Sequence, residues 1–460
     1  MSLPYRTRAM AIPATTVAAL VMAGLLGHGG LRAPTAMAQS TIPANLTQLR
    51  PIKGIAYDPK PSDFPQSAYF DSDFFNSDFT AIWGDDGPGS RNDLQTFKDA
   101  GINFLHLYNW NAQRANHTAF LDAARAHGMA VMVPISNFTA GTIDGNTPGC
   151  DTCPFGYQAA FNLVKGIFDQ VYGGGVSPHP AVAMWGIFNE YDLNRIDALN
   201  VVFVVQAILT LEDQAGTPPA NRLPITAPVS DAMFDRAHRG ALSRTQAVVF
   251  ERATLQWLAT NPGKNVDTSD PPDLPGGVLA ILAIANTLED AQARTTYKSK
   301  FDSAPVTVSP VPADFWKTRF IASANPFREG SALANYLTSP AQFQSAFPGT
   351  TAWNTLPPLF FAEMGFSQVD AGHDLSRQAS VVLGQIRCTH PLAVSAGTPQ
   401  GYFLGSAFFQ HTFVDASHFE AFQVVPGQFS THPYRVDVLT ALPQWASVQQ
   451  GYSADTATCP

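Results

Sequence analysis

An alternation of apolar segments with helical segments constrains the fold of this 460-residue chain more than any other sequence feature. Short apolar runs, typical of strands buried on both faces, are followed by stretches with apolar residues at helical spacing. Several of these stretches end in glycine, which is a common helix stop. The eight expected strands lie at 52–58, 102–110, 129–136, 181–190, 223–230, 317–327, 358–366 and 402–411.

The segments between these strands complete a repeated strand–helix pattern. Expected helices lie at 91–101, 117–128, 157–175, 196–216, 375–387 and 436–448. Eight such units in succession predict a closed (β/α)8 TIM barrel, in a single domain over about 50–450. The stretch 231–316 is too long for one unit and holds at least two helical patterns. We interpret it as a helical insertion after the fifth strand, and a small separate domain is the alternative.

The first 38 residues resemble a secretory signal peptide. Arg6 and Arg8 precede an apolar stretch at 16–26, and Ala36-Met37-Ala38 forms a cleavage site of small residues. No other segment approaches the ~18 apolar residues that a membrane span needs. We therefore expect a secreted protein, extracellular or periplasmic, with a retained N-terminal anchor as the alternative.

The charge balance narrows the class of partner. The formal net charge is −9, and removal of a leader that carries three arginines and no acidic residue leaves −12. This excess of negative charge disfavours nucleic acid or an anionic membrane as the main partner. A neutral or cationic substrate is the better match.

The four cysteines predict disulfides, because an even count in an exported protein usually means pairing. Cys150 and Cys153 are close enough in sequence to close a small loop, and Cys388 is a candidate partner for the C-terminal Cys459. A zinc site is the other interpretation of Cys-x-x-Cys, but it needs about four ligands. No second pair of ligands follows at a suitable spacing, so we expect no metal.

Polar residues gather where the expected strands end, which is where barrels of this kind place their active sites. Two of them are glutamates, Glu190 after the fourth strand and Glu363 near the end of the seventh. A pair of facing carboxylates can cleave a glycosidic bond, one protonating the leaving oxygen and the other attacking the anomeric carbon. The alternative is that each glutamate is a structural carboxylate paired with a lysine or arginine.

The sequence around these glutamates resembles that of a known superfamily. WGIFNEYDLN at 185–194 resembles the fourth-strand Asn-Glu signature of the clan A retaining glycoside hydrolases, which are (β/α)8 barrels. FFAEMGFS at 360–367 is similar to the segment that carries the nucleophile in that clan, and GINFLHLYNW at 101–110 resembles its second strand. Cellulases, mannanases, glucanases and glucanosyltransferases belong to the clan, and these motifs do not select a family within it.

The resemblance implies roles for individual residues. Glu190 would be the acid/base, Glu363 the nucleophile, and Asn189 a ligand of the sugar 2-hydroxyl. One departure concerns the second strand, where the clan often has an arginine and this chain has His106. We expect His106 to donate a hydrogen bond to Glu363 in place of that arginine, with a packed barrel histidine as the alternative.

Further residues at strand ends are candidates for sugar binding. Pyranose rings stack on aromatic side chains and hydrogen-bond to polar ones. The substrate-binding candidates are Asn189, His106, Tyr57, Tyr108, Asn109, Asn325 and Trp83, with Trp110 and Tyr191 as further aromatic candidates. For each aromatic residue, ordinary packing is the competing interpretation.

Together these features predict a secreted retaining glycoside hydrolase acting on a neutral β-linked polysaccharide, glucan or mannan. Two carboxylates suffice for the reaction, so no cofactor is expected. The alternatives are a transglycosylase with the same glutamates and a carbohydrate-binding barrel without catalysis. A secreted structural protein is a more distant alternative, and the sequence does not indicate the oligomeric state.

Overall fold

The structure is a computed structural model. It describes residues 49–61, 73–85, 87–145, 153–191, 193–194, 196, 198–230, 309, 318–338, 358–394, 403–412, 417–425, 427, 436–453 and 459. All of these belong to one compact unit, Gln39–Pro460. The expected leader at 1–38 and, apart from residue 309, the expected insertion at 231–316 lie outside them. No helix in the described ranges is long and apolar enough to cross a membrane.

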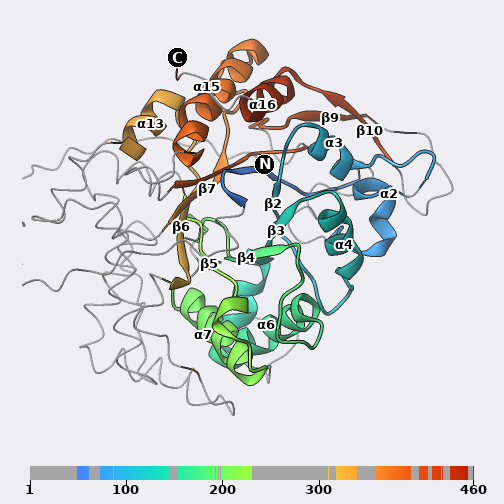
Figure 1. Cartoon of the computed structure of the whole chain (residues 1–460), viewed down its shortest axis with the longest axis vertical. Coiled ribbons are helices and arrows are strands. Elements are labelled where there is room, and N and C mark those ends of the chain that lie inside the picture. The colour runs from blue at the N-terminus through green and yellow to red at the C-terminus, as the bar shows by residue number, and fades with distance from the viewer. Residues whose placement is uncertain are drawn as a thin grey trace, which may run out of the picture. The chain divides into compact units, whose positions relative to one another are not determined.

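Eight parallel strands close into a barrel in chain order, which confirms the predicted fold class (Figure 1). They are β1 Ile52–Ala56, β2 Phe104–His106, β3 Ala130–Ile135, β4 Val182–Ile187, β5 Ile225–Thr226, β6 Phe320–Ala324, β7 Leu359–Met364 and β8 Phe403–Phe408. Every one falls inside its expected segment. The apolar runs are explained by burial on both faces, since helices cover the outside and side chains fill the inside.

Two apolar clusters mark the two faces of the strands. Met184 on β4 and Phe360 on β7 belong to the cluster inside the barrel, whereas their neighbours Trp185 and Phe361 belong to the cluster under the helices. This period of two is the ordinary alternation of a strand. It also decides which strand-end side chains can reach a cavity at the mouth of the barrel.

Closure of the barrel depends on a glycine where β8 meets β1. Ile52 pairs with Gly405, and a Cβ atom at position 405 would overlap the backbone of Ile52. Gly405 also has a φ of 130°, which side-chain-bearing residues rarely adopt. The first and last strands can approach each other there because the residue has no side chain.

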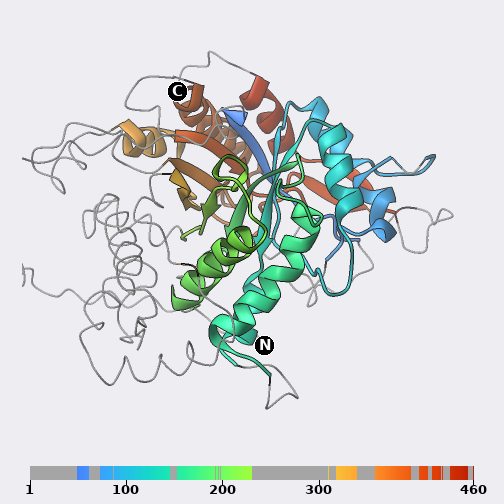
Figure 2. The same ribbon diagram turned by 60° about the horizontal axis from the view of Figure 1, so that its bottom comes forward.

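Helices surround the barrel, and two helix pairs lie side by side in both views (Figures 1 and 2). One pair is α6 with α7, and the other is α15 with α16. The longer helices are α3 Asp93–Asp99, α4 Thr118–Ala126, α6 Gly156–Tyr172, α7 Ala198–Gln214, α13 Gly330–Thr338, α15 Leu375–Val394 and α16 Pro443–Ser453. Short helical turns are η2 Ser77–Phe79, α2 Thr80–Trp83, η3 Asn137–Thr139, α5 Ala140–Ile143 and η4 Pro219–Asn221.

One predicted helix, at 436–448, is wrong over its first half. Residues Val438–Ala441 form strand β10, which pairs antiparallel with β9, Phe422–Val425, and helix α16 begins only at Pro443. Antiparallel pairing with β9 gives the backbone of 438–441 hydrogen-bond partners on one side in the extended form, which favours a strand over a helix there. Proline fits the first turn of α16 because its missing N–H has no partner there.

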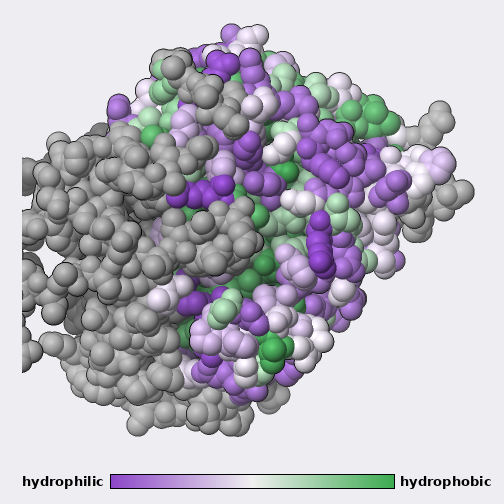
Figure 3. All heavy atoms as spheres, in the orientation of Figure 1, coloured by the Kyte–Doolittle hydropathy of each residue, from purple (hydrophilic) through white to green (hydrophobic). Residues whose placement is uncertain are grey.

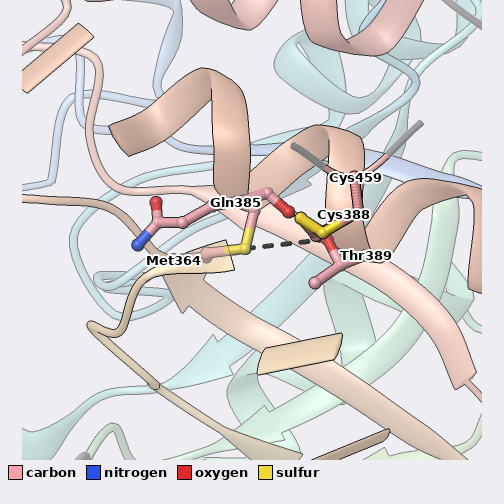
Figure 4. Close-up of a disulfide and its surroundings, with 5 residues drawn as sticks. All are labelled: Met364, Gln385, Cys388, Thr389 and Cys459. Carbon is pink, nitrogen blue, oxygen red and sulfur yellow. Dashed lines mark hydrogen bonds between the residues drawn. A yellow bond between two sulfur atoms is a disulfide. The ribbon is translucent and has the colours of Figure 1, made fainter. Parts of the chain in front are cut away.

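A disulfide joins Cys388 on α15 to Cys459, as predicted (Figure 4). Cys153 is also disulfide-bonded, while Cys150 lies outside the described residues. Next to Cys388, Thr389 contacts the sulfur of Met364 on β7 at 3.8 Å. One turn earlier, Gln385 donates to the carbonyl of Gly365 at 2.8 Å. Helix α15 therefore supports the strand end that carries Glu363.

Candidate active site

Strand β4 ends in a strained turn that presents Asn189 and Glu190. Phe188 and Glu190 have φ angles of 52° and 49°, in the left-handed region that residues with side chains rarely adopt. Such a residue costs of the order of 1–3 kcal/mol, and such costs concentrate at functional sites. The turn is held by hydrogen bonds from Phe188 N to Ile135 O at 2.9 Å and from Glu190 N to Pro228 O at 3.0 Å.

Asn137, after strand β3, holds the middle of this turn. Its side-chain amide donates to the carbonyl of Asn189 at 2.7 Å and accepts from the backbone N–H of Asn189 at 2.6 Å. The amide thus satisfies both backbone groups of the residue between the two left-handed positions. Asn194 adds hydrogen bonds to the carbonyls of Asn189 and Glu190, both at 3.0 Å.

Glu363 lies opposite, on β7, and only 3% of its surface is exposed. The pairing of β7 with β8 is irregular between Phe361 and Met364, around this residue. Ala362 belongs to the inner cluster and Met364 to the outer one, while the Glu363 side chain lines the cavity. Irregularities of this kind commonly re-aim a side chain next to an active site.

Neutral donors orient the carboxylate of Glu363. The hydroxyl of Tyr108 and the side-chain amide of Asn189 both donate to Oε1, each at 2.8 Å. Asn325 donates to the amide oxygen of Asn189 at 3.0 Å, which fixes the orientation of that amide. A carboxylate held in this way cannot rotate freely, which suits a group that must attack one atom of a substrate.

The electrostatic environment of Glu363 disfavours its ionised form. Burial raises its pKa well above the usual range, and the neighbouring Glu190 carboxylate raises it further. Hydrogen bonds from Tyr108, Asn189 and Asn325 lower the pKa and offset part of this shift. No lysine or arginine occurs among the described residues that line the cavity. Within the described lining, the buried carboxylate of Glu363 is therefore held by neutral donors rather than by a lysine or arginine.

Both glutamates line one cavity of about 500 Å³ at the mouth of the barrel. This volume is typical of a small-molecule site. Its other walls come from the ends of β2, β3, β4 and β8. The described lining residues are His106, Leu107, Tyr108, Asn109, Met132, Pro134, Ile135, Ser136, Asn137, Phe138, Gly186, Phe188, Asn189, Asn194, Ile196, Phe409 and Gln410.

His106 lines the cavity but does not make the expected hydrogen bond. Its Nδ1 lies 2.9 Å from the carbonyl oxygen of Ala362, and the contact to the Glu363 carboxylate comes from Tyr108 instead. Because a carbonyl oxygen only accepts, Nδ1 must carry the proton. Burial lowers the pKa of His106 to about 4, so the ring is neutral at neutral pH. His106 therefore supports the backbone next to Glu363 rather than its charge.

Two aromatic candidates lie outside the cavity and must be corrected. Tyr57 is fully buried under the helices, where its hydroxyl donates to Asp93 at 2.9 Å. Trp83 on α2 is buried against Phe120, with ring centroids 5.5 Å apart. Neither side chain is placed to stack on a sugar. The further aromatic candidates, Trp110 and Tyr191, are buried as well.

The remaining candidates divide between the cavity and its support. Asn109 lines the cavity and accepts from Ser136 Oγ at 3.0 Å, while its own buried NH₂ group has no hydrogen-bond partner among the described residues. An unpaired buried donor at a cavity is a candidate ligand for a substrate hydroxyl. Asn325 is fully buried, lowers the pKa of Glu363 by hydrogen bonding and also orients the amide of Asn189.

Sequence reasoning missed two residues of the loop after β3. In the sequence Asn137 is a polar residue at a strand end and the first residue of an Asn-x-Thr sequon, and neither feature predicts its hydrogen bonds to the backbone that follows another strand. Phe138 gave no signal, because an isolated phenylalanine is typical of packing. In the structure it is exposed and lines the cavity.

No group of three or more His, Cys, Asp or Glu residues is placed to hold a metal ion within the described ranges. No family model matches the chain, and no curated protein matches it.

Solved structures with a similar arrangement include Gas2p of Saccharomyces cerevisiae. Its complex with laminaripentaose is 14% identical over 88% of this chain and 65% of that chain, with a TM-score of 0.46. Its complex with laminaritriose and laminaritetraose is 15% identical over the same shares, also with a TM-score of 0.46. The chain thus spans just under two thirds of the solved chains it resembles. At these values the likeness carries no conclusion about activity, and the barrel rests on its own strand pairing.

Proposed function

We propose that this chain is a retaining glycoside hydrolase that acts on a neutral β-linked glycan, glucan or mannan. The observation that carries the proposal is the pair of carboxylates, Glu190 and Glu363, on one cavity that has no described lysine or arginine in its lining. A structural carboxylate pair would be expected to bind a cation. The described lining offers hydroxyl, amide and aromatic groups and no lysine or arginine, which favours an uncharged sugar.

The two glutamates differ in burial and in access to water, and these differences support the proposed roles. Glu363 is buried and oriented by Tyr108 and Asn189, so its carboxylate is held for attack on the anomeric carbon. Glu190 is half-buried at the cavity wall, where water can reach it. An acid/base must give a proton to the leaving oxygen and then take one from the incoming water, so access to water suits it.

The reaction then follows the two-step course of retaining enzymes. Glu363 attacks the anomeric carbon while Glu190 protonates the departing glycosidic oxygen, and a glycosyl ester of Glu363 forms. Glu190, now ionised, removes a proton from water, which attacks the same carbon and releases Glu363. The β-linkage is taken from the resemblance of the two glutamate segments to clan A enzymes. If a sugar hydroxyl replaces the water, the same residues catalyse transglycosylation.

A product screen tests this proposal. Wild type, Glu190→Gln and Glu363→Gln would be incubated with β-1,3-glucan, β-1,4-glucan and β-mannan, and the products separated by chromatography. Glu329→Gln is a matched control, because Glu329 is exposed and lies outside the cavity lining. We expect activity on one glycan that is lost in both cavity variants and kept in the control. Binding without turnover in wild type would favour a carbohydrate-binding barrel instead.

Export is a separate part of the proposal. The leader at 1–38 predicts a mature chain that begins at Gln39. Expression of the full chain with its leader, followed by N-terminal sequencing of the protein recovered outside the cytoplasm, tests this. An intact N-terminus on membrane-bound protein would favour a retained anchor.

A further inference from the structure

Phe138 is an exposed aromatic residue on a catalytic cavity. Its exposed fraction of 63% is the largest among the large hydrophobic residues that the structure describes. The face drawn in Figure 3 carries mostly hydrophilic side chains, with hydrophobic ones in smaller groups. Phe138 nevertheless lines the cavity shared by Glu190 and Glu363. A ligand that covers an exposed phenylalanine ring removes apolar surface from water, and this lowers the free energy of the complex.

The backbone that carries this ring is held rigidly. Phe138 is the middle residue of η3, Asn137–Thr139. Its N–H donates to Ser136 Oγ at 3.3 Å, and the Thr139 hydroxyl donates to the carbonyl of Ser136 at 2.7 Å. The neighbouring Asn137 amide is bonded to the backbone of Asn189. Little conformational entropy would be lost when a ligand covers a ring on so constrained a backbone.

Other aromatic residues near the cavity are already engaged. Tyr108 uses its hydroxyl to hold Glu363. Phe188 is buried, and the half-buried Phe409 packs against Phe327 and Phe419, with ring centroids 5.8 and 5.2 Å away. Phe138 is therefore the described cavity aromatic with most surface available to a ligand.

The position of Phe138 assigns it to one side of the scissile bond. Asn137 is bonded to the backbone of Asn189, which directly precedes the acid/base Glu190, so the loop that carries Phe138 is tied to the turn that carries Glu190. Two further lining residues, Asn194 and Ile196, come from the loop after Glu190. Because the acid/base must touch the glycosidic oxygen, the sugar that leaves with that oxygen is held on this side.

We propose that Phe138 is the stacking platform for the leaving-group sugar and for an acceptor sugar that later takes its place. This inference rests on the proposed glycosidase function. The ligand it fits is a neutral hexopyranose, whose C–H face covers the ring while its hydroxyls remain in the polar cavity. In transfer, the acceptor hydroxyl attacks the anomeric carbon of the glycosyl ester, and the bond between that carbon and the Glu363 carboxylate oxygen breaks. The hydroxyl proton passes to the Glu190 carboxylate.

A comparison of two donors tests the platform. An oligosaccharide of the active glycan places a sugar on the leaving-group side, whereas the matching glycosyl fluoride places only fluoride there. For Phe138→Ala we expect kcat/KM on the oligosaccharide to fall about 5- to 10-fold more than on the fluoride. The KM for a sugar acceptor in transfer should rise by a similar factor. Phe138→Tyr should restore both values.

Phe155→Ala is the matched control, since Phe155 is also exposed but does not line the cavity. It should change neither donor's kcat/KM. Equal losses on the two donors for Phe138→Ala, or no loss on either, would overturn the platform while the glycosidase proposal stands. A wild type inactive on both donors, or a fully active Glu363→Gln, would instead overturn the proposed function, and the platform with it.

Discussion

Two buried polar clusters lie at the mouth of the barrel, and each surrounds one carboxylate. Asp93, at the start of α3, accepts hydrogen bonds from the guanidinium of Arg91 at 2.8 and 2.6 Å and from the hydroxyl of Tyr57 at 2.9 Å. Glu363, at the end of β7, accepts from Tyr108 and has no lysine or arginine around it in the described lining of its cavity. Both carboxylates are almost completely buried.

The difference between these clusters supports a structural role for Asp93 and, under the proposed function, a chemical role for Glu363. A cation beside a buried carboxylate stabilises its ionised form and makes that carboxylate less reactive. Without a cation, burial keeps the pKa of Glu363 high and its ionised form reactive. The Asp93 cluster is also closed to solvent, whereas the Glu363 cluster opens into a cavity of about 500 Å³. Charge pairing and access, rather than residue type, distinguish the two.

The largest expected effect is the loss of activity in Glu363→Gln. The amide keeps an oxygen for Tyr108 and Asn189 but cannot form a glycosyl ester, so kcat should fall about 10⁴-fold or more. The measurement is the initial rate on the glycan identified by the product screen. In the Asp93 cluster, Asp93→Asn should leave the rate per folded molecule within about two-fold. Similar losses in both variants would mean that the two clusters act as one unit.

Asp93→Asn should instead have the largest effect on stability. It breaks the buried ion pair between Arg91 and Asp93 and leaves the guanidinium with the more distant carboxylate of Asp437 at 4.0 Å. Breaking a buried pair costs up to about 3–5 kcal/mol. Urea unfolding followed by tryptophan fluorescence measures this cost. The control is Asp169→Asn, which removes the exposed ion pair with Lys165 and should cost about 0.5 kcal/mol or less. Equal costs in the two variants would contradict the structural role of the Asp93 cluster.

Tyr108→Phe should shift the pH dependence of activity. The hydrogen bond from Tyr108 lowers the pKa of Glu363, so its loss raises that pKa further. Glu363 must be ionised to attack, and the acidic limb of kcat/KM should therefore move to higher pH. At neutral pH we expect a loss of about 10-fold or more. Tyr157→Phe, which removes a buried hydroxyl bonded to Thr210 away from the cavity, should leave the profile unchanged.

The raised pKa of Glu363 also predicts a stability that falls as the pH rises. A carboxyl whose pKa is higher in the folded than in the unfolded chain adds to the free energy of unfolding. This contribution is fully present below about pH 4.3, the ordinary pKa of a glutamate. That contribution is lost as the pH rises through the folded-state pKa. Glu363→Gln removes the titration, so the variant should be the more stable protein at pH 8 and not at pH 4. Parallel melting curves at both pH values measure this, and a constant difference would contradict it.

Much of the fold could be predicted because strand and helix leave different local patterns. Most of the strand residues are apolar, as burial on both faces requires, with exceptions such as Lys53 in β1 and Glu363 in β7. The helix predicted over 438–441 was wrong because these residues form a strand by pairing with β9, and a local sequence pattern does not reveal a partner strand elsewhere in the chain. Both glutamates were predicted to lie at strand ends, and the structure places them on one cavity. The role of Asn137 was not, since it depends on hydrogen bonds to the backbone of another strand.

The misplacement of Tyr57 has a simpler cause. Ile52 belongs to the inner cluster, whereas Ile55 and Tyr57 belong to the outer one, as the period of two requires. Position at a strand end says which end of the barrel a residue occupies. Its place in the alternation says whether the side chain can reach the cavity. Applied to β2, the same alternation puts His106 and Tyr108 on the inner side, where both line the cavity.

Tyr57→Phe tests this distinction with the smallest expected change. The variant loses the hydrogen bond to Asp93, which still has Arg91, so we expect a loss of about 1–2 kcal/mol in the free energy of unfolding. Because the ring lies under the helices, KM for the glycan should stay within about two-fold of wild type. A KM raised as far as in Phe138→Ala would place Tyr57 in the sugar site after all. An unchanged KM with reduced stability would assign the Tyr57 hydroxyl a structural role in the Asp93 cluster.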